Sequence, residues 1–120
     1  MGDYRKLRVT AKIKLLTVMV YRITAAWPRH ELFGLTAQIR RAMTSVGCNL
    51  AEGCGRNRPR ELAQYTRMAL GSANEVEYCC DLAAELGYLD QNAAHDVRQE
   101  IDLVKRMLSR LVARVGNAGN

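Results

Sequence analysis

The C-terminal third of the chain has the most regular apolar spacing in the sequence. From Ala94 to Val115 the apolar positions recur at intervals of 3, 4, 3, 4, 3 and 4 residues. This alternation keeps one stripe of side chains on a single helix face and is typical of the seam along which bundled helices pack. Asp90 is a favourable N-cap for the segment. The pattern predicts an amphipathic helix over residues 91–115, followed by a frayed tail over residues 116–120.

Three earlier segments show the same period, and short connections separate them. Helices are predicted over residues 4–26, 35–53 and 59–86. The first ends before Pro28. The third begins at Pro59 and ends at a glycine C-cap, Gly87. No segment has the alternation of a strand. Short connections place neighbouring helices antiparallel. We therefore predict an all-α, antiparallel up-and-down four-helix bundle that forms a single domain over residues 1–120.

Several apolar and small residues carry more specific expectations. We expect Trp27 and Phe33 to anchor the core. Gly47 predicts a bend or a close helix contact, and Gly71 with Ser72 predicts a close backbone approach. Extra apolar side chains beside the predicted seams suggest a second buried face, as in an oligomer. They are Leu15, Met19, Leu103 and Met107.

Composition restricts the class of protein. The 120 residues are 48% hydrophobic and 25% charged, which is typical of a packed globular chain. No apolar run reaches the roughly 20 residues of a membrane span, and the first ten residues lack the apolar core of a signal peptide, so we expect a cytoplasmic protein. The four cysteines have no Cys-x-x-Cys spacing, so we expect reduced, buried thiols. They are Cys48, Cys54, Cys79 and Cys80.

The net charge of +6 is unevenly distributed along the chain. Residues 1–67 carry 13 Lys and Arg against 4 Asp and Glu, whereas residues 68–120 carry 5 against 8. A basic half can attract a polyanion, or it can pair with acidic faces of neighbouring helices or subunits. The charge alone leaves both interpretations open.

Several stretches together resemble the bacterial four helix bundle protein family, also called the 23S rRNA intervening-sequence protein family. The accessory protein of diversity-generating retroelements is related to it. The resemblance covers most of the chain and departs from the family pattern at Thr10, where Trp is usual, and at Gly47, where Pro is usual. It is carried by Tyr4 to Leu7, Trp27-Pro28, ELFGLT from Glu31, QIRRAMTSVGCNLAEG from Gln38, ALGSANEVE from Ala69 and AAELGYL from Ala83.

The resemblance implies a four-helix protomer that assembles into a ring-like homopentamer with no established catalytic activity. For the retroelement relative it further implies nucleic-acid binding and partnership with a reverse transcriptase. No cofactor is implied.

A basic patch is the candidate binding site. Arginines alternate through the connection between the second and third helices, and others are expected on adjoining helical surfaces, where they could contact phosphates. The alternative is that these side chains are solvated or pair with acidic residues of a neighbour. The candidates are Arg40, Arg41, Arg56, Arg58, Arg60 and Arg67.

Polar and small residues of the family-like stretches are interpreted as structural. We expect Glu52 to pair with Arg40 or Arg41 and Asn49 to satisfy backbone groups near Gly47 or across a subunit contact. Gly53, Gly71 and Ser72 belong to the same structural set.

The sequence offers no catalytic constellation, since neither His30 nor His95 is at helical spacing from a Cys, a Ser or the other His. The nearest approach to a metal-ligand pattern is His95 with Asp96 or Glu100, for which surface solvation is the favoured interpretation. We expect a non-catalytic, homo-oligomeric protein that binds RNA or DNA through the basic patch. The alternative is an oligomeric scaffold or adaptor that binds a protein partner.

Overall fold

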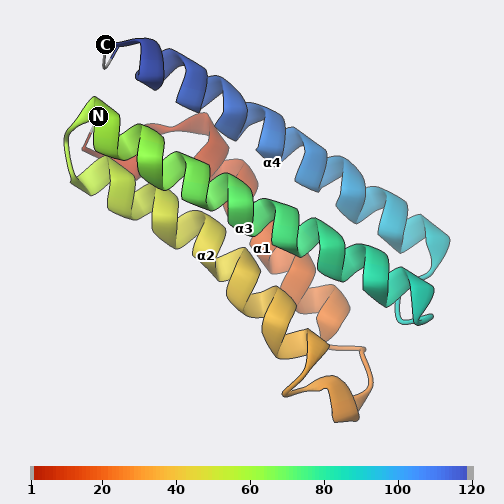
Figure 1. Cartoon of the computed structure of the whole chain (residues 1–120). Coiled ribbons are helices and arrows are strands. Elements are labelled where there is room, and N and C mark those ends of the chain that lie inside the picture. Colours follow the sequence, from red (N-terminus) through yellow and green to blue (C-terminus); the bar gives the residue numbers. More distant parts are fainter. Residues whose placement is uncertain (1, 119–120) are drawn as a thin grey trace.

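The computed structural model describes residues 2–118, which form four α-helices and two short 3-10 turns (Figure 1). No strand occurs among these residues. The elements are η1 (Tyr4–Lys6), α1 (Arg8–Thr24), η2 (Arg29–Glu31), α2 (Leu35–Gly55), α3 (Pro59–Glu85) and α4 (Gln91–Ala118). The predicted all-α four-helix bundle is confirmed.

The helices run antiparallel to their neighbours in the chain. Helix α3 packs extensively on α2 and α4, and α1 contacts α2 and α4 to close the bundle. Helix α1 has 17 residues, against 27 in α3 and 28 in α4, so it is roughly 15 Å shorter than they are. The start of α1 and the end of α4 lie at the same end of the bundle (Figure 1).

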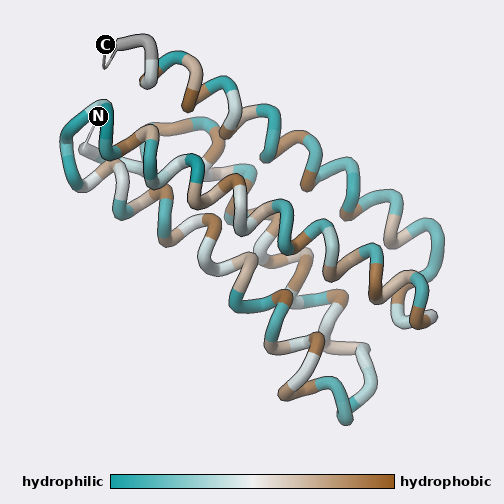
Figure 2. Tube along the Cα trace, viewed as in Figure 1, coloured by the Kyte–Doolittle hydropathy of each residue, from teal (hydrophilic) through white to brown (hydrophobic). Residues whose placement is uncertain are grey.

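The core follows the apolar lines read from the sequence. Hydrophobic residues recur about once per turn along all four helices (Figure 2). In α4, Ile101, Val104 and Leu108 are at most 1% exposed. Burying an aliphatic side chain of this size contributes about 1.5–3 kcal/mol to the stability of the fold. Because isolated helices are only marginally stable in water, these buried rows supply the free energy that holds the bundle together.

The first predicted helix is interrupted near its start. Asp3 caps the η1 turn through the Arg5 N–H, and Leu7 is extended, so α1 begins at Arg8 rather than at residue 4. Thr10 is buried and donates a 2.6 Å hydrogen bond to the Tyr4 carbonyl, which holds the turn against the helix. Helix α1 ends at Thr24, two residues before the predicted end.

The other connections follow local chemistry. Gly87 has a φ of 81°, and Tyr88 N–H bonds the Ala83 carbonyl at 2.9 Å, so the predicted glycine C-cap is confirmed. The Asp90 carboxylate accepts from Ala93 N–H at 2.8 Å, as predicted for an N-cap. Helix α4 continues to Ala118, so the prediction of a frayed tail from residue 116 is wrong for residues 116–118. The last two predicted tail residues lie outside the described residues.

The close approach between α2 and α3 occurs at Gly53 and not at Gly71. A Cβ on Gly53 would lie 2.8 Å from Tyr65 Cβ, whereas a Cβ on Gly71 would meet nothing within 4 Å. The expectation for Gly71 is therefore wrong, because this glycine lies on the solvent side of α3. A Cβ on Gly47 would lie 3.4 Å from the Ile13 side chain, so α1 and α2 approach closely there.

Candidate interaction surface

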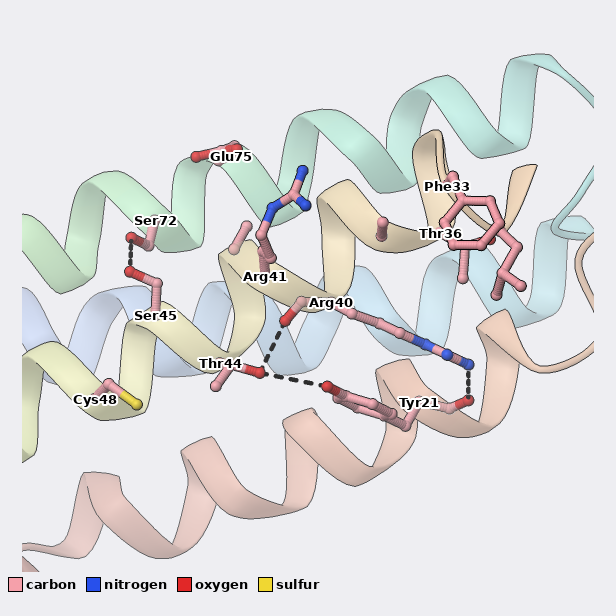
Figure 3. A pocket seen from close by; sticks show the side chains of 13 residues that line it. Tyr21, Phe33, Thr36, Arg40, Arg41, Thr44, Ser45, Cys48, Ser72 and Glu75 are labelled. Atoms are coloured by element: carbon pink, nitrogen blue, oxygen red, sulfur yellow. Dashed lines mark hydrogen bonds between the residues drawn. The ribbon is translucent and has the colours of Figure 1, made fainter. Parts of the chain in front are cut away.

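An open surface groove lies where the end of α1, the turn before α2, and helices α2 and α3 meet (Figure 3). It encloses about 880 Å³ and opens to solvent. Three exposed large hydrophobic side chains line it, including the most exposed such side chain among the described residues. They are Phe33, 93% exposed, Leu32, 47% exposed, and Tyr21, 43% exposed.

Phe33 does not anchor the core, so that sequence prediction is wrong. The same prediction is confirmed for Trp27, which is 6% exposed and packs against Tyr88 with ring centroids 5.9 Å apart. Gly34 then turns the chain into α2. Phe33 is left on the outer side of this turn, where it projects beside the groove (Figure 3).

Arg40 is fixed within the wall of the groove. Its Nε donates to Thr24 Oγ1 at 2.9 Å and its Nη2 to the Tyr21 carbonyl at 3.4 Å (Figure 3). Its guanidinium carbon also lies 4.8 Å from the centre of the Tyr21 ring, within cation–π range. These contacts attach α2 to the end of α1. Arg40 is therefore a structural residue of the groove.

Arg41 differs from its neighbour in exposure and contacts. It is exposed, and its Nη2 donates to Gln38 Oε1 at 3.3 Å. Gln38 in turn donates to Glu75 Oε2 at 2.7 Å, which links α2 to α3 beside the groove. The lining of the groove thus includes the exposed guanidinium of Arg41 and the carboxylate of Glu75, which Gln38 links.

A polar cluster of Ser45, Asn49 and Ser72 joins α2 and α3 beside the groove. Asn49 donates to both the carbonyl and the hydroxyl of Ser45, at 3.0 and 2.9 Å. Ser72 donates to the same hydroxyl at 3.0 Å. Asn49 thus satisfies a backbone carbonyl one helical turn earlier, and Ser72 provides the interhelical contact.

Glu52 pairs with Arg56 and not with Arg40 or Arg41. The Arg56 Nε lies 3.0 Å from Glu52 Oε2, because the two residues are one helical turn apart. Arg40 and Arg41 lie about three turns away along α2, roughly 16–18 Å, beyond the reach of the Glu52 side chain. The predicted pairing is wrong for this reason.

Four of the six candidate arginines fall into two separate groups. Arg40 and Arg41 lie near the start of α2, about 22 Å along the helix from Arg56. In the second group Arg56 also contacts Glu61 at 3.5 Å and donates to the Tyr65 hydroxyl at 3.0 Å, and Arg58 lies 3.6 Å from Glu61. The expectation of one continuous patch is therefore wrong.

Arg60 and Arg67, like Arg40 and Arg41, are free of carboxylate contacts among the described residues. Arg60 and Arg67 are exposed, and neither forms an ion pair with the described residues. They are seven residues apart on α3, which places them two turns apart on one face.

Three of the four cysteines are buried, whereas Cys48 is exposed beside the groove. The prediction of buried thiols is therefore wrong for Cys48, which lies on the outward face of α2. Burial raises the pKa of the Cys54 and Cys79 thiols and raises the pKa of Cys80 to about 12. All four are free thiols.

The histidines are separated from other potential ligands. His30 lies in η2 and His95 in the second turn of α4, and both are exposed. Within residues 2–118, no three His, Cys, Asp or Glu side chains come close enough to hold a metal ion. None of the described helices is both long enough and apolar enough to cross a membrane.

Sequence reasoning missed Glu31 as an organising residue. Its carboxylate accepts from Leu35 N–H at 3.1 Å and from the Tyr88 hydroxyl at 2.8 Å. The first bond caps α2, and the second ties the α3–α4 connection to the turn before α2. The sequence signal for the first bond was a glutamate four residues before the first residue of α2. The second bond could not be predicted, because Tyr88 is 57 residues away in the sequence.

The four antiparallel helices define a helical-bundle protein, and the open groove beside exposed apolar side chains is its candidate interaction surface. The 23S rRNA-intervening sequence protein family model matches residues 5–110. The chain belongs to this family. No curated protein matches the chain.

A solved structure supports the fold. It is the crystal structure of a protein of unknown function from the S23 ribosomal protein family of Bacteroides thetaiotaomicron. The TM-score is 0.79 at 22% identity, and the match covers 88% of this chain and 95% of the other. At this identity the similarity shows the shared fold alone.

Proposed function

We propose that this chain is a non-catalytic protein that assembles with copies of itself and serves as a scaffold or adaptor for a protein partner. The observation that carries the proposal is the 93% exposure of Phe33 beside an open groove. Fully burying such a side chain contributes about 1.5–3 kcal/mol, which a contacting subunit can supply.

A second groove extends the apolar surface along α1 and α2. It encloses about 460 Å³, and its lining includes Ile13, Val18, Leu50 and Ala51. Val18 is 46% exposed, and Leu15, on the same helix, is 62% exposed. Leu15 was one of the residues expected at a second buried face. The two grooves share Thr44 and Cys48, so they form one continuous surface across the α1–α2 side.

The family resemblance favours five copies in the assembly. The free thiols suit a reducing compartment such as the cytoplasm, because oxidation of an exposed Cys48 would crosslink copies.

Light scattering of Phe33→Ser over a range of concentrations tests the assembly surface. The wild-type chain should give a multiple of 13.5 kDa, and the variant should shift toward the protomer mass. Tyr78→Ser is the matched control, because Tyr78 is a 67% exposed aromatic on α3 outside both grooves. A wild-type chain that stays monomeric, or a Phe33→Ser variant that keeps the full mass, would overturn the proposal.

Nucleic-acid binding through the predicted arginines is a second candidate function. The observation favouring it is that Arg60 and Arg67 are exposed on one face of α3 without a carboxylate contact among the described residues. A reverse transcriptase or similar enzyme would be a fitting partner for such a protein. Duplex binding that falls in Arg60→Gln/Arg67→Gln would support this function, and unchanged binding would remove both residues from it.

A further inference from the structure

Two segments of the chain carry many cations and no acidic residue. Residues 4–30 hold seven Lys or Arg, and residues 103–116 hold four, with no Asp or Glu in either segment. Every carboxylate side chain except that of Asp3 lies within residues 31–102. The segments are widely separated in sequence, so only the fold decides whether their charges combine.

The fold brings these segments together at one end of the bundle. Helices α1 and α4 are in contact, and the start of α1 lies near the end of α4 (Figure 1). Between them is a groove of about 470 Å³. Its cationic lining consists of Lys6, Arg8, Arg110 and Arg114, and its apolar lining of Leu7, Val9, Met107 and Leu111. We call this the α1–α4 groove.

The cations of the α1–α4 groove have no acidic partners within residues 2–118. Lys6, Arg8, Arg110 and Arg114 form no ion pair there. This contrasts with the middle of α4, where Arg98 pairs with Asp81 and Lys105 with Glu77. The charges of the groove are therefore not neutralised by ion pairs, although the Asp3 carboxylate interacts electrostatically with Lys6.

Helix stability does not explain the cations on the α1 side. Arg8 is the first residue of α1, whose first turn has no acidic residue and no side-chain cap. Positive charge at a helix N-terminus is unfavourable because the helix dipole is positive there. Lys6 and Arg8 therefore oppose local stability, whereas a bound anion at this position would reverse the sign of the interaction.

On the α4 side, too, the positions of the cations oppose the stability of the helix. Arg106, Arg110 and Arg114 are spaced four residues apart on one face, and like charges at this spacing repel. No basic residue lies in the last turn of α4, so the helix dipole does not explain this row of arginines. A neighbouring groove of about 620 Å³ includes Arg106 and Arg110, so the row continues from the first groove along α4. Asp102, one turn before Arg106, is the one carboxylate in the lining of this neighbouring groove.

We propose that the α1–α4 groove and the adjoining arginine row of α4 bind the phosphate backbone of double-stranded nucleic acid. The row spans about 12 Å of helix, and duplex DNA presents one negative charge per roughly 1.7 Å of its axis. Arginine forks match phosphate oxygens bidentately. Several phosphates can therefore be contacted at once.

The lining of the groove favours a duplex over a single strand or a membrane. None of the side chains lining it is aromatic, so bases have no stacking platform there. No large hydrophobic residue of the described part of α4 is exposed, whereas a membrane-binding helix inserts such residues. Contacts to the backbone alone predict binding without base specificity. This site is separate from the assembly surface around Phe33.

The test is fluorescence anisotropy of a labelled 20-base-pair duplex of arbitrary sequence, titrated with nuclease-treated protein at several salt concentrations. Arg110→Gln/Arg114→Gln should lower affinity on the order of 10-fold to 100-fold at 0.1 M salt and reduce the logarithmic salt slope by about 2. Both side chains are exposed, and circular dichroism verifies that the variant is folded.

The matched control is Arg22→Gln/Arg29→Gln, which removes the same charge. Arg22 lies 14 residues beyond Arg8, about 21 Å along the chain's first helix, and both control residues are exposed. A control variant that keeps wild-type affinity supports binding in the α1–α4 groove. Equal losses of affinity in the two variants would mean that only net charge matters and would overturn the proposal. A loss confined to Arg60→Gln/Arg67→Gln would place binding on α3 instead.

Two further outcomes bear on the ligand class. No duplex binding even at low salt would overturn the proposal. Binding to vesicles containing phosphatidylserine without binding to the duplex would also overturn it and would assign the groove to a membrane surface.

Discussion

Tyr88 donates a 2.8 Å hydrogen bond to the Glu31 carboxylate, which ties the α3–α4 connection to the turn before α2. The other oxygen of this carboxylate accepts from Leu35 N–H at the start of α2. The pKa of Glu31 lies below its ordinary value chiefly because of the Leu35 bond and then because of the Tyr88 bond. One carboxylate therefore organises this end of the bundle.

We predict that the Glu31 contribution to stability is lost in acid. A depressed folded-state pKa means that the contribution is fully present above the unfolded-state value near 4.5 and disappears as pH falls through the folded-state pKa. In urea unfolding, Glu31→Gln should be less stable than the wild type at neutral pH, and the difference should shrink as the medium becomes acidic. Glu85→Gln, an exposed control near the end of α3, should show no such trend. A difference that is independent of pH would show that charge is irrelevant at this cap.

Replacing Gly53 with Ala should destabilise the protein by about 1–3 kcal/mol. The added methyl would lie 2.8 Å from Tyr65 Cβ and 3.2 Å from Leu62 Cδ1, so the α2–α3 contact has to separate. Gly71→Ala is the control, because its methyl meets nothing within 4 Å and should stabilise α3 by about 0.5–1 kcal/mol. Chemical denaturation measures both free energies. The same sign for the two variants would refute the assignment of the close approach to Gly53.

Replacing Arg40 with Lys should cost about 1–2 kcal/mol, although the charge is kept. Lysine cannot reproduce the guanidinium contacts with Thr24, the Tyr21 carbonyl and the Tyr21 ring together. Arg41→Lys should change the free energy of unfolding by less than about 0.5 kcal/mol, because this residue is exposed. Equal stability of the two variants would mean that Arg40 is not the structural link between α1 and α2.

The thiols should react in two classes. At mildly alkaline pH a thiol reagent should modify Cys48 rapidly, whereas the buried Cys54, Cys79 and Cys80 should react only on unfolding. The raised pKa values of these three thiols, about 12 for Cys80, further lower their reactivity. Cys48→Ser should abolish the fast phase, and denaturant should expose four thiols in the wild type. A fast phase that persists in Cys48→Ser would contradict the burial pattern.

The sequence by itself determined the helices and the inner faces that they present. The spacing of apolar residues in α4 predicts the buried row through Ile101, Val104 and Leu108, because helical periodicity is a local property of the chain. The caps at Gly87 and Asp90 were predictable for the same reason, since their hydrogen bonds join residues close in sequence.

Only the tertiary structure decided where the exposed features lie. Phe33 has an apolar side chain suited to the core, like Trp27, yet the fold buries Trp27 against Tyr88 and leaves Phe33 exposed. The arginines of α2 and α3 looked like one patch because they are close in sequence, yet helix length separates them and Glu52 and Glu61 pair with two of them. Conversely, Arg8 and Arg110 are about a hundred residues apart and line one groove. Charge carries no periodic signal that predicts such neighbours, because long-range proximity depends on how helices pack.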